Sequence, residues 1–86
     1  MNILFSELFG TFILVAVILS TNNKYYIALA FLLAIMVANI SKGHVNPVVT
    51  MVKYIQGAIT KKQAFNYISG QVLGALTAYI VVTKLA

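Results

Sequence analysis

The chain has 86 residues, of which 62% are hydrophobic and 8% are charged, and its formal net charge is +5. Soluble globular domains carry about 25% charged residues, so this composition excludes an ordinary soluble domain and predicts a single-domain membrane protein. The basic residues are all lysines, spread between apolar runs, which is typical of membrane-flanking charge and not of a nucleic-acid-binding surface. The sequence contains no cysteine, so disulfides and thiolate metal sites are excluded.

The first apolar run extends from Met1 to Ser20, close to the roughly 20 residues that a helix needs to cross the hydrocarbon core. No basic residue precedes Ile3, Glu7 lies within the run, and no small-x-small cleavage pattern follows it, so we interpret the run as mature structure and not as a signal peptide. An ionisable residue inside such a run is by default a candidate functional residue.

A polar turn at residues 21–24 separates the first run from the second, Tyr25 to Ile40, so the two spans should be antiparallel neighbours. The second run is short for a membrane span. It reaches the required length if the helix covers about residues 24–41, with Tyr25 and Tyr26 at the level of the lipid headgroups.

A further apolar run, Val45 to Ile59, is too short to cross the membrane and is expected to be re-entrant or interfacial. The last run, Ala64 to Leu85, is long enough for a third span, and Lys61 and Lys62 before it are interpreted as a membrane-surface anchor. Small residues recur at helical spacing in the second and third runs, which predicts a compact bundle, because membrane helices associate through close backbone approach. These residues are Ala30, Ala34 and Ala38 in the second run, and Gly70, Gly74 and Ala78 in the third.

The segment SKGHVNPVV, residues 41–49, places an Asn-Pro pair where the chain returns to apolar sequence. Asn46 is a favoured N-cap and Pro47 a favoured first helical residue, so a short helix is predicted at about residues 46–57. Non-helical backbone at membrane depth is tolerated only where protein or a water-filled cavity satisfies its polar groups. A helix N-terminus with free N–H donors and an asparagine amide suits a pore for neutral solutes that repels cations. The alternative is an interfacial helix that follows a loop.

Three motifs carry a resemblance to a known family. SKGHVNPVVT resembles the SGAHxNPAVT signature of the major intrinsic proteins, the aquaporin and glycerol-facilitator family, while SELFGTFILV is similar to that family's E-x-x-G-T-x-x-L-V opening and YISGQVLGA to its Y-x-x-x-Q-x-x-G-A segment. The motifs follow the family's order and cover nearly the whole chain. The resemblance implies an all-α membrane protein with three transmembrane helices and one re-entrant half-helix, half of an aquaporin-like fold. The single repeat would occupy residues 1–86, with spans at about 1–20, 24–41 and 63–85.

Members of this family normally have six spans and two half-helices, arranged as two inverted repeats whose Asn-Pro-Ala motifs meet at mid-membrane. This chain resembles the first repeat, because the second usually has arginine after its Asn-Pro-Ala and Val49 stands there in this chain. One repeat supplies half a pore, so the resemblance implies an antiparallel homodimer, a larger oligomer, or a heteromeric partner with the second repeat. The lysines mildly favour one orientation, with Lys42, Lys53, Lys61 and Lys62 on one side and Lys24 and Lys84 on the other.

The resemblance further implies passive transport of water or of small neutral solutes such as glycerol, without a cofactor and without enzymatic activity. Asn46 would be the central hydrogen-bond donor, Pro47 the residue that starts the half-helix, and Val48 the residue in place of the motif's alanine. Val49 in place of arginine would leave an apolar and wider outer filter, with cation exclusion left to the helix dipoles.

The resemblance also gives roles to residues outside the Asn-Pro pair. Glu7 would accept hydrogen bonds from the non-helical backbone beside the half-helix. Gln71 would be a similar buried polar residue that supports the half-helix, or it would equally well form a simple hydrogen bond between two helices. His44 is interpreted first as a neutral residue that packs the loop, and second as a pH-reporting residue at the pore mouth. The family's aromatic filter position falls on Tyr26 by a gapless count and on Phe31 by the LAF match.

Two other functions are compatible with parts of the sequence. The chain would also suit a non-conducting membrane interaction protein, or a truncated repeat that associates with a full-length relative. A small dual-topology drug exporter would use Glu7 as its proton-coupled substrate site, but that function does not explain the Asn-Pro segment.

Overall fold

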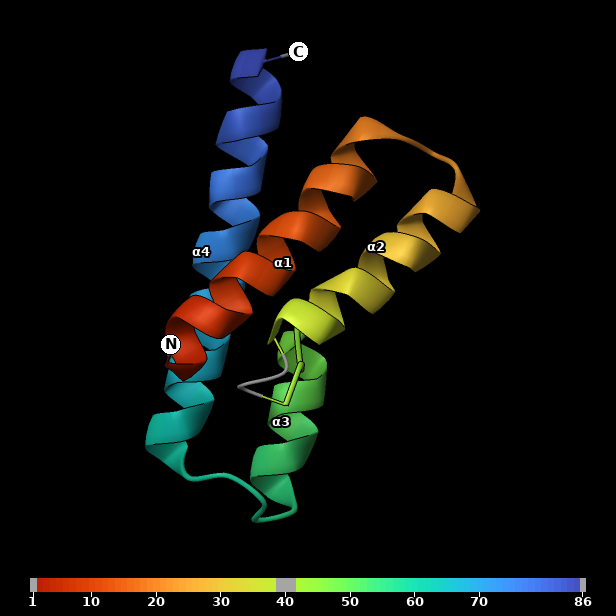
Figure 1. Cartoon of the computed structure of the whole chain (residues 1–86). Coiled ribbons are helices and arrows are strands. Elements are labelled where there is room, and N and C mark those ends of the chain that lie inside the picture. The colour runs from red at the N-terminus through yellow and green to blue at the C-terminus, as the bar shows by residue number, and fades with distance from the viewer. Residues whose placement is uncertain (1, 39–41, 86) are drawn as a thin grey trace.

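The computed structural model describes residues 2–38 and 42–85, and within them all of the regular secondary structure is helical (Figure 1). The all-α class predicted from the sequence is therefore confirmed. The predicted end of the second span near residue 41 lies outside the described residues. The helices of the described part are α1 (Ile3–Ser20), α2 (Lys24–Val37), α3 (Pro47–Ile55) and α4 (Lys61–Leu85).

Local side-chain chemistry sets the start of each helix. Asn2, Asn23 and Asn46 precede α1, α2 and α3, and each asparagine side chain accepts a hydrogen bond from a backbone N–H in the first turn of its helix. Before α4, Thr60 N–H donates to Gln63 Oε1 at 2.8 Å and Gln63 N–H donates to Thr60 Oγ1 at 3.1 Å. This reciprocal pair is a capping box, and each such cap is worth about 1 kcal/mol.

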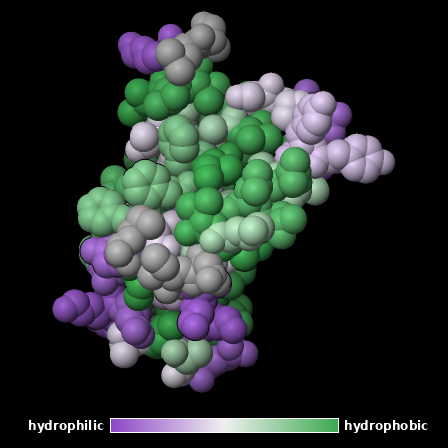
Figure 2. Space-filling model, in the orientation of Figure 1, coloured by the Kyte–Doolittle hydropathy of each residue, from purple (hydrophilic) through white to green (hydrophobic). Residues whose placement is uncertain are grey.

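The helices differ in whether their lengths suit a membrane crossing. At about 1.5 Å per residue, the 18 residues of α1 and the 25 of α4 extend about 27 and 37 Å, and both are apolar enough to cross a membrane. The 14 residues of α2 and the 9 of α3 extend only about 21 and 14 Å. Figure 2 shows hydrophobic residues over the middle of the molecule and hydrophilic residues at its two ends.

Helix α1 is the centre of the bundle, because both α2 and α4 pack on it. Against α2 the contact is made by small residues: Ala34 and Ala38 are fully buried, and a Cβ built on Gly10 would lie 2.8 Å from the Ala34 carbonyl oxygen. Against α4 the approach is closer still. A Cβ on Gly70 would overlap the carbonyl oxygen of Leu4, so only glycine allows the two backbones to reach this distance. Gly74 meets the carbonyl oxygen of Leu8 in the same way, one turn further along.

Replacing Gly70 with alanine should therefore destabilise the bundle, although the same change in an open helix position adds about 1 kcal/mol of helix propensity. We expect a net loss of about 1–3 kcal/mol from overpacking, measured as a lower midpoint of thermal unfolding in a non-ionic detergent by circular dichroism. Ala28→Leu, at an exposed position of α2, adds more bulk and should leave the midpoint unchanged. A Gly70→Ala protein that unfolds at a higher temperature than wild type would contradict close packing at this contact.

Candidate functional site

The site is built around the first turn of α3, which packs against α4. Asn46 caps this helix: its Oδ1 accepts the Val48 N–H at 2.8 Å, and its carbonyl oxygen accepts the Thr50 N–H at 3.2 Å. Pro47 occupies the first helical position, where its missing N–H leaves no donor unsatisfied. The predicted helix start at Asn46-Pro47 is thus where α3 begins, and the helix ends at Ile55.

The loop before α3 has an unusual backbone. Lys42, Gly43 and Val45 all have positive φ, at 73°, 64° and 45°. For a β-branched residue such as Val45 this conformation is a true outlier, and it costs about 1–3 kcal/mol unless the surroundings hold it. The Glu7 side chain of α1 does so, because its Oε1 accepts the Val45 N–H at 2.7 Å. A carboxyl group in α1 therefore holds the backbone that leads into α3.

A buried hydrogen-bond network extends this contact to α4. Gln71 Nε2 donates to the same Glu7 oxygen at 2.9 Å and also to Thr50 Oγ1 at 3.0 Å. Glu7 and Thr50 are fully buried and Gln71 is 3% exposed, so these polar groups depend on one another for hydrogen bonds that water would otherwise supply. The network ties α1, the loop, α3 and α4 together at one point.

His44 completes the buried cluster from the loop side. Its ring stacks on Tyr67 of α4 with centroids 3.8 Å apart and an interplanar angle of 9°, and its Nδ1 lies 3.0 Å from Thr50 Oγ1. Burial lowers the pKa of His44 below its usual value, with a smaller raising effect from Glu7 and a further lowering effect from Lys53. The imidazole is therefore neutral at pH 7 and fills the loop as a packed, hydrogen-bonded ring.

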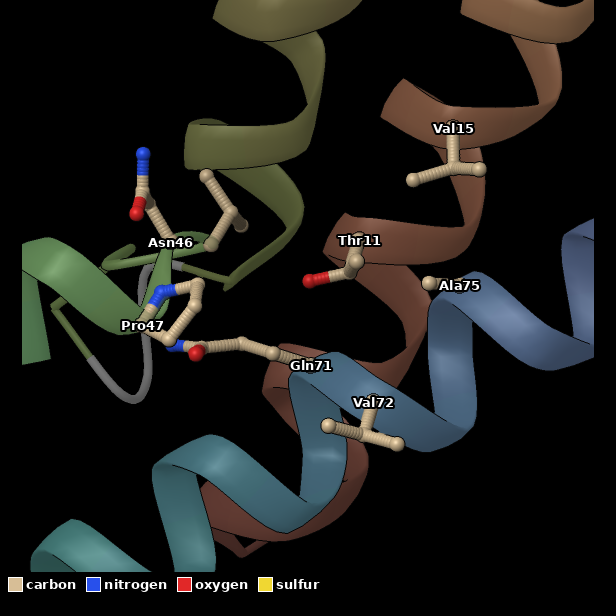
Figure 3. A pocket seen from close by; sticks show the side chains of 8 residues that line it. Thr11, Val15, Asn46, Pro47, Gln71, Val72 and Ala75 are labelled. Carbon is tan, nitrogen blue, oxygen red and sulfur yellow. The ribbon is translucent and has the colours of Figure 1, made fainter.

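A cavity of about 310 Å³ opens beside the start of α3, between α1 and α4 (Figure 3). Asn46 and Pro47 border it from the α3 side, and the hydroxyl of Thr11 points into it from α1. In Figure 3 the Asn46 amide nitrogen is directed away from the Pro47 ring. The full lining consists of Thr11, Val15, Val45, Asn46, Pro47, Gln71, Val72 and Ala75.

The remaining predicted site residues lie apart from this cavity. Val48 and Val49 are 64% and 39% exposed on α3 and are not among its lining residues. Tyr26 lines a second cavity of about 290 Å³ between α1 and α2, and Phe31 is exposed on α2 outside that lining. Within the described residues no three His, Cys, Asp or Glu side chains gather into a group that would hold a metal ion.

Sequence reasoning assigned no role to three residues that the structure places at the site. Thr50 Oγ1 accepts a hydrogen bond from Gln71 Nε2, Tyr67 stacks on His44, and Thr11 lines the cavity. All three stand inside the quoted motifs, as the last residue of SKGHVNPVVT, the first of YISGQVLGA and the threonine of SELFGTFILV. The spacing of six residues between His44 and Thr50, across a helix start, was the available signal for their contact.

Comparison with known proteins places these features in a family. A family model described as "Major intrinsic protein" matches residues 25–86. The chain is 39% identical over 83 residues to "Glycerol uptake facilitator protein-like 6" of Lactiplantibacillus plantarum, which covers 85% of this chain and 38% of that protein. It is 47% identical over 52 residues to "Probable aquaporin TIP-type" of Medicago truncatula, covering 59% of this chain and 21% of that protein. No solved structure gives a significant match.

The chain belongs to the major intrinsic protein family, and the resemblance read from its three motifs is confirmed. It is an integral membrane protein, in agreement with the two helices that are long and apolar enough to cross a bilayer. It spans less than two-fifths of the length of the glycerol-facilitator relative and about a fifth of the aquaporin relative.

The Glu7 contact gives the first prediction at this site. Glu7→Leu keeps a similar volume but leaves the Val45 N–H without its acceptor and Gln71 Nε2 without one of its two acceptors, and a buried unsatisfied donor costs about 1–3 kcal/mol. We expect a clear fall in the thermal unfolding midpoint, a smaller fall for Glu7→Gln, which keeps an acceptor oxygen, and none for Ser20→Ala at the exposed end of the same helix. Wild-type stability in Glu7→Leu would show that the loop does not depend on this carboxyl group.

The lowered pKa of His44 gives the second prediction at this site. Its pKa is lowered in the folded chain, so below the reference pKa of about 6.5 the unfolded state binds a proton that the folded state resists. Stability should be constant above about pH 6.5 and fall as the pH drops below it, by at most about 1.4 kcal/mol per pH unit. Unfolding midpoints at pH 7.5, 6.5 and 5.5 measure this fall. His44→Phe keeps a ring against Tyr67 and should remove the pH dependence; an equal fall in that variant would assign the effect to another group.

Proposed function

We propose that this chain forms a passive channel for water and small neutral solutes such as glycerol by pairing with a second repeat of opposite orientation, most simply as an antiparallel homodimer. In this arrangement α1, α2 and α4 are the transmembrane helices and α3 is the re-entrant half-helix. The observation that carries the proposal is the start of α3, where Asn46 and Pro47 border an open cavity between the two long helices.

The length and charge of α3 support a position halfway into the membrane. Its 9 residues extend about 14 Å, which is about half of a hydrocarbon core of about 30 Å. Lys53 stands in its last turn and Lys61 begins α4 just beyond the connecting loop, and lysines favour the membrane surface. With that end at the surface, the Asn46 end lies near the middle of the bilayer, where two half-helices from opposite sides would meet.

The chemistry at this end favours neutral, oxygen-bearing solutes. A helix N-terminus carries a partial positive charge and free N–H donors, so two such ends facing each other repel cations, protons included. The Asn46 amide offers N–H donors to a passing hydroxyl or water oxygen. Because the solute is neutral and crosses down its own gradient, the proposal requires no cofactor and no catalytic residue.

The outer part of the pathway supports glycerol as well as water. Val48 and Val49 are exposed on α3, and Val49 stands where the second repeat of the family has arginine, so a homodimer would have an apolar opening at both ends. Tyr26 lines a separate cavity between α1 and α2 and Phe31 is exposed on α2, so the aromatic filter position stays open between these two residues. The name of the bacterial relative, a glycerol uptake facilitator-like protein, agrees with this solute class.

Stopped-flow light scattering tests the proposal on liposomes that contain this chain alone. After a step in an impermeant osmolyte, and then in glycerol, we expect permeation well above that of empty liposomes. Asn46→Ala removes both the amide donor and the helix cap and should reduce the rate several-fold, while Asn22→Ala in the exposed turn between α1 and α2 should not. Permeability equal to that of empty liposomes, with folded protein inserted, would favour the non-conducting interaction protein instead.

A further inference from the structure

Three exposed lysines stand at one end of the molecule, where α3 ends and α4 begins. Lys53 lies in the last turn of α3, and Lys61 and Lys62 are the first two residues of α4. Only residues 56–60 separate the two helices, which pack against each other. Hydrophilic residues gather at this end of the molecule (Figures 1 and 2). We call Lys53, Lys61 and Lys62 the basic patch.

The connection that carries the basic patch is closed by backbone hydrogen bonds. Gly57 has a φ of 77°, its N–H donates to the Tyr54 carbonyl oxygen at 3.0 Å, and the Ala58 N–H donates to the Lys53 carbonyl oxygen at 2.9 Å. These two bonds form a Schellman motif, which ends α3. The capping box described above starts α4 directly afterwards. The fold therefore holds the backbone of the patch in one arrangement.

The chain supplies no side-chain carboxylate to balance the charge of the patch. Glu7 is the only acidic residue of the sequence, and it is fully buried with its Oε1 bonded to Val45 and Gln71. Lys61 and Lys62 also stand at the positive end of the α4 dipole, where cations are unfavourable. The group that balances this charge therefore comes from outside the chain.

The surroundings of the patch favour a lipid headgroup as that group. Helix α4 is apolar and long enough to cross the membrane and begins at Lys61, so this end lies at a membrane surface. Ile55 is 78% exposed and Phe65 is 70% exposed, and Phe65 shares a helix face with Lys61 and Lys62 because it follows them by four and three residues. Apolar side chains beside lysines suit the boundary between acyl chains and headgroups. A soluble anion would leave these apolar side chains in water.

We propose that the basic patch binds the headgroups of anionic phospholipids. The lysine ammonium groups donate to the lipid phosphate, while Ile55 and Phe65 contact the adjoining acyl chains. A lysine near an anionic membrane surface strengthens binding by roughly five-fold. The inference goes beyond the proposed function, because it requires neither conduction nor a second copy of the chain.

Tryptophan fluorescence tests the patch in vesicles. The chain has no tryptophan, so Phe65→Trp gives a patch reporter. Tyr25→Trp, at a position 71% exposed at the start of α2, gives a control reporter at the opposite end of the molecule (Figure 1). Brominated phosphatidylglycerol or brominated phosphatidylcholine in phosphatidylcholine vesicles quenches the tryptophan that it contacts. The two quenching curves give the ratio of phosphatidylglycerol to phosphatidylcholine binding beside each reporter.

The comparison does not depend on how the chain is oriented, because both leaflets contain the same lipids. We expect phosphatidylglycerol to bind roughly 3- to 10-fold more strongly than phosphatidylcholine beside the patch reporter, and less than about 2-fold more strongly beside the control reporter. In about 1 M salt, where the screening length is about 3 Å, the ratio at the patch reporter should fall toward that of the control reporter.

Matched charge variants assign the preference to the patch. Lys61→Gln/Lys62→Gln should lower the ratio at the patch reporter to about that of the control reporter, and Lys53→Gln should lower it in part. Lys24→Gln/Lys84→Gln removes the same charge outside the patch and should leave the ratio unchanged. These lysines are all exposed, so the variants should keep the wild-type unfolding midpoint.

The outcomes decide the proposal without reference to conduction. Equal ratios at the two reporters, or an unchanged patch ratio in Lys61→Gln/Lys62→Gln, would overturn it. Loss of the preference on adding inorganic phosphate at constant ionic strength would also overturn it, and would assign the patch to a free anion. A patch that prefers phosphatidylglycerol in vesicles that do not conduct water or glycerol would leave this inference standing while the channel proposal fails.

Discussion

The structure depends on one carboxyl oxygen, Glu7 Oε1, which accepts both the Val45 N–H and Gln71 Nε2. The first bond holds a β-branched residue in a left-handed backbone conformation, and the second fixes the direction of an amide in α4. Without this acceptor, the loop between α2 and α3 would carry buried backbone groups that neither a helix nor lipid satisfies. An acidic side chain inside an apolar helix is expensive on its own, and here the cost is offset because the oxygen replaces water for two other buried donors.

The network requires α1 and α4 to be close together, and the glycines make that possible. Gly70 and Gly74 bring the α4 backbone against the carbonyl oxygens of Leu4 and Leu8, one of which lies on each side of Glu7 along the chain. Because lipid gives no hydrophobic drive for helix association, this contact must be stabilised by close packing and by the buried hydrogen bonds. Packing and polar chemistry therefore support each other: the glycines set the distance at which Gln71 reaches Glu7, and the hydrogen bonds favour the orientation in which the glycines fit.

The sequence allowed more to be predicted about local structure than about the site. The all-α class, the helix start at Asn46-Pro47 and the small-residue stripes follow from residue chemistry that acts within a few positions, and the structure has α3 begin at Pro47 with Ala34 and Gly70 buried. The role of Thr50 was not found, because its partner Gln71 is 21 residues away and its contact with His44 depends on the turn of the loop. Positive φ at Val45 was equally hidden, since no propensity of valine indicates it.

The geometry at the start of α3 also bears on the proposed pairing of two repeats. Among the described residues, Glu7 Oε1 bonds the loop before α3 and Gln71 of α4, and the start of α3 borders a cavity between α1 and α4. In the proposed two-fold pair, two such helix starts would face each other, with the two Asn46 amides on the path between the halves. In that channel one helix end would both face the second repeat and present the Asn46 amide to the solute.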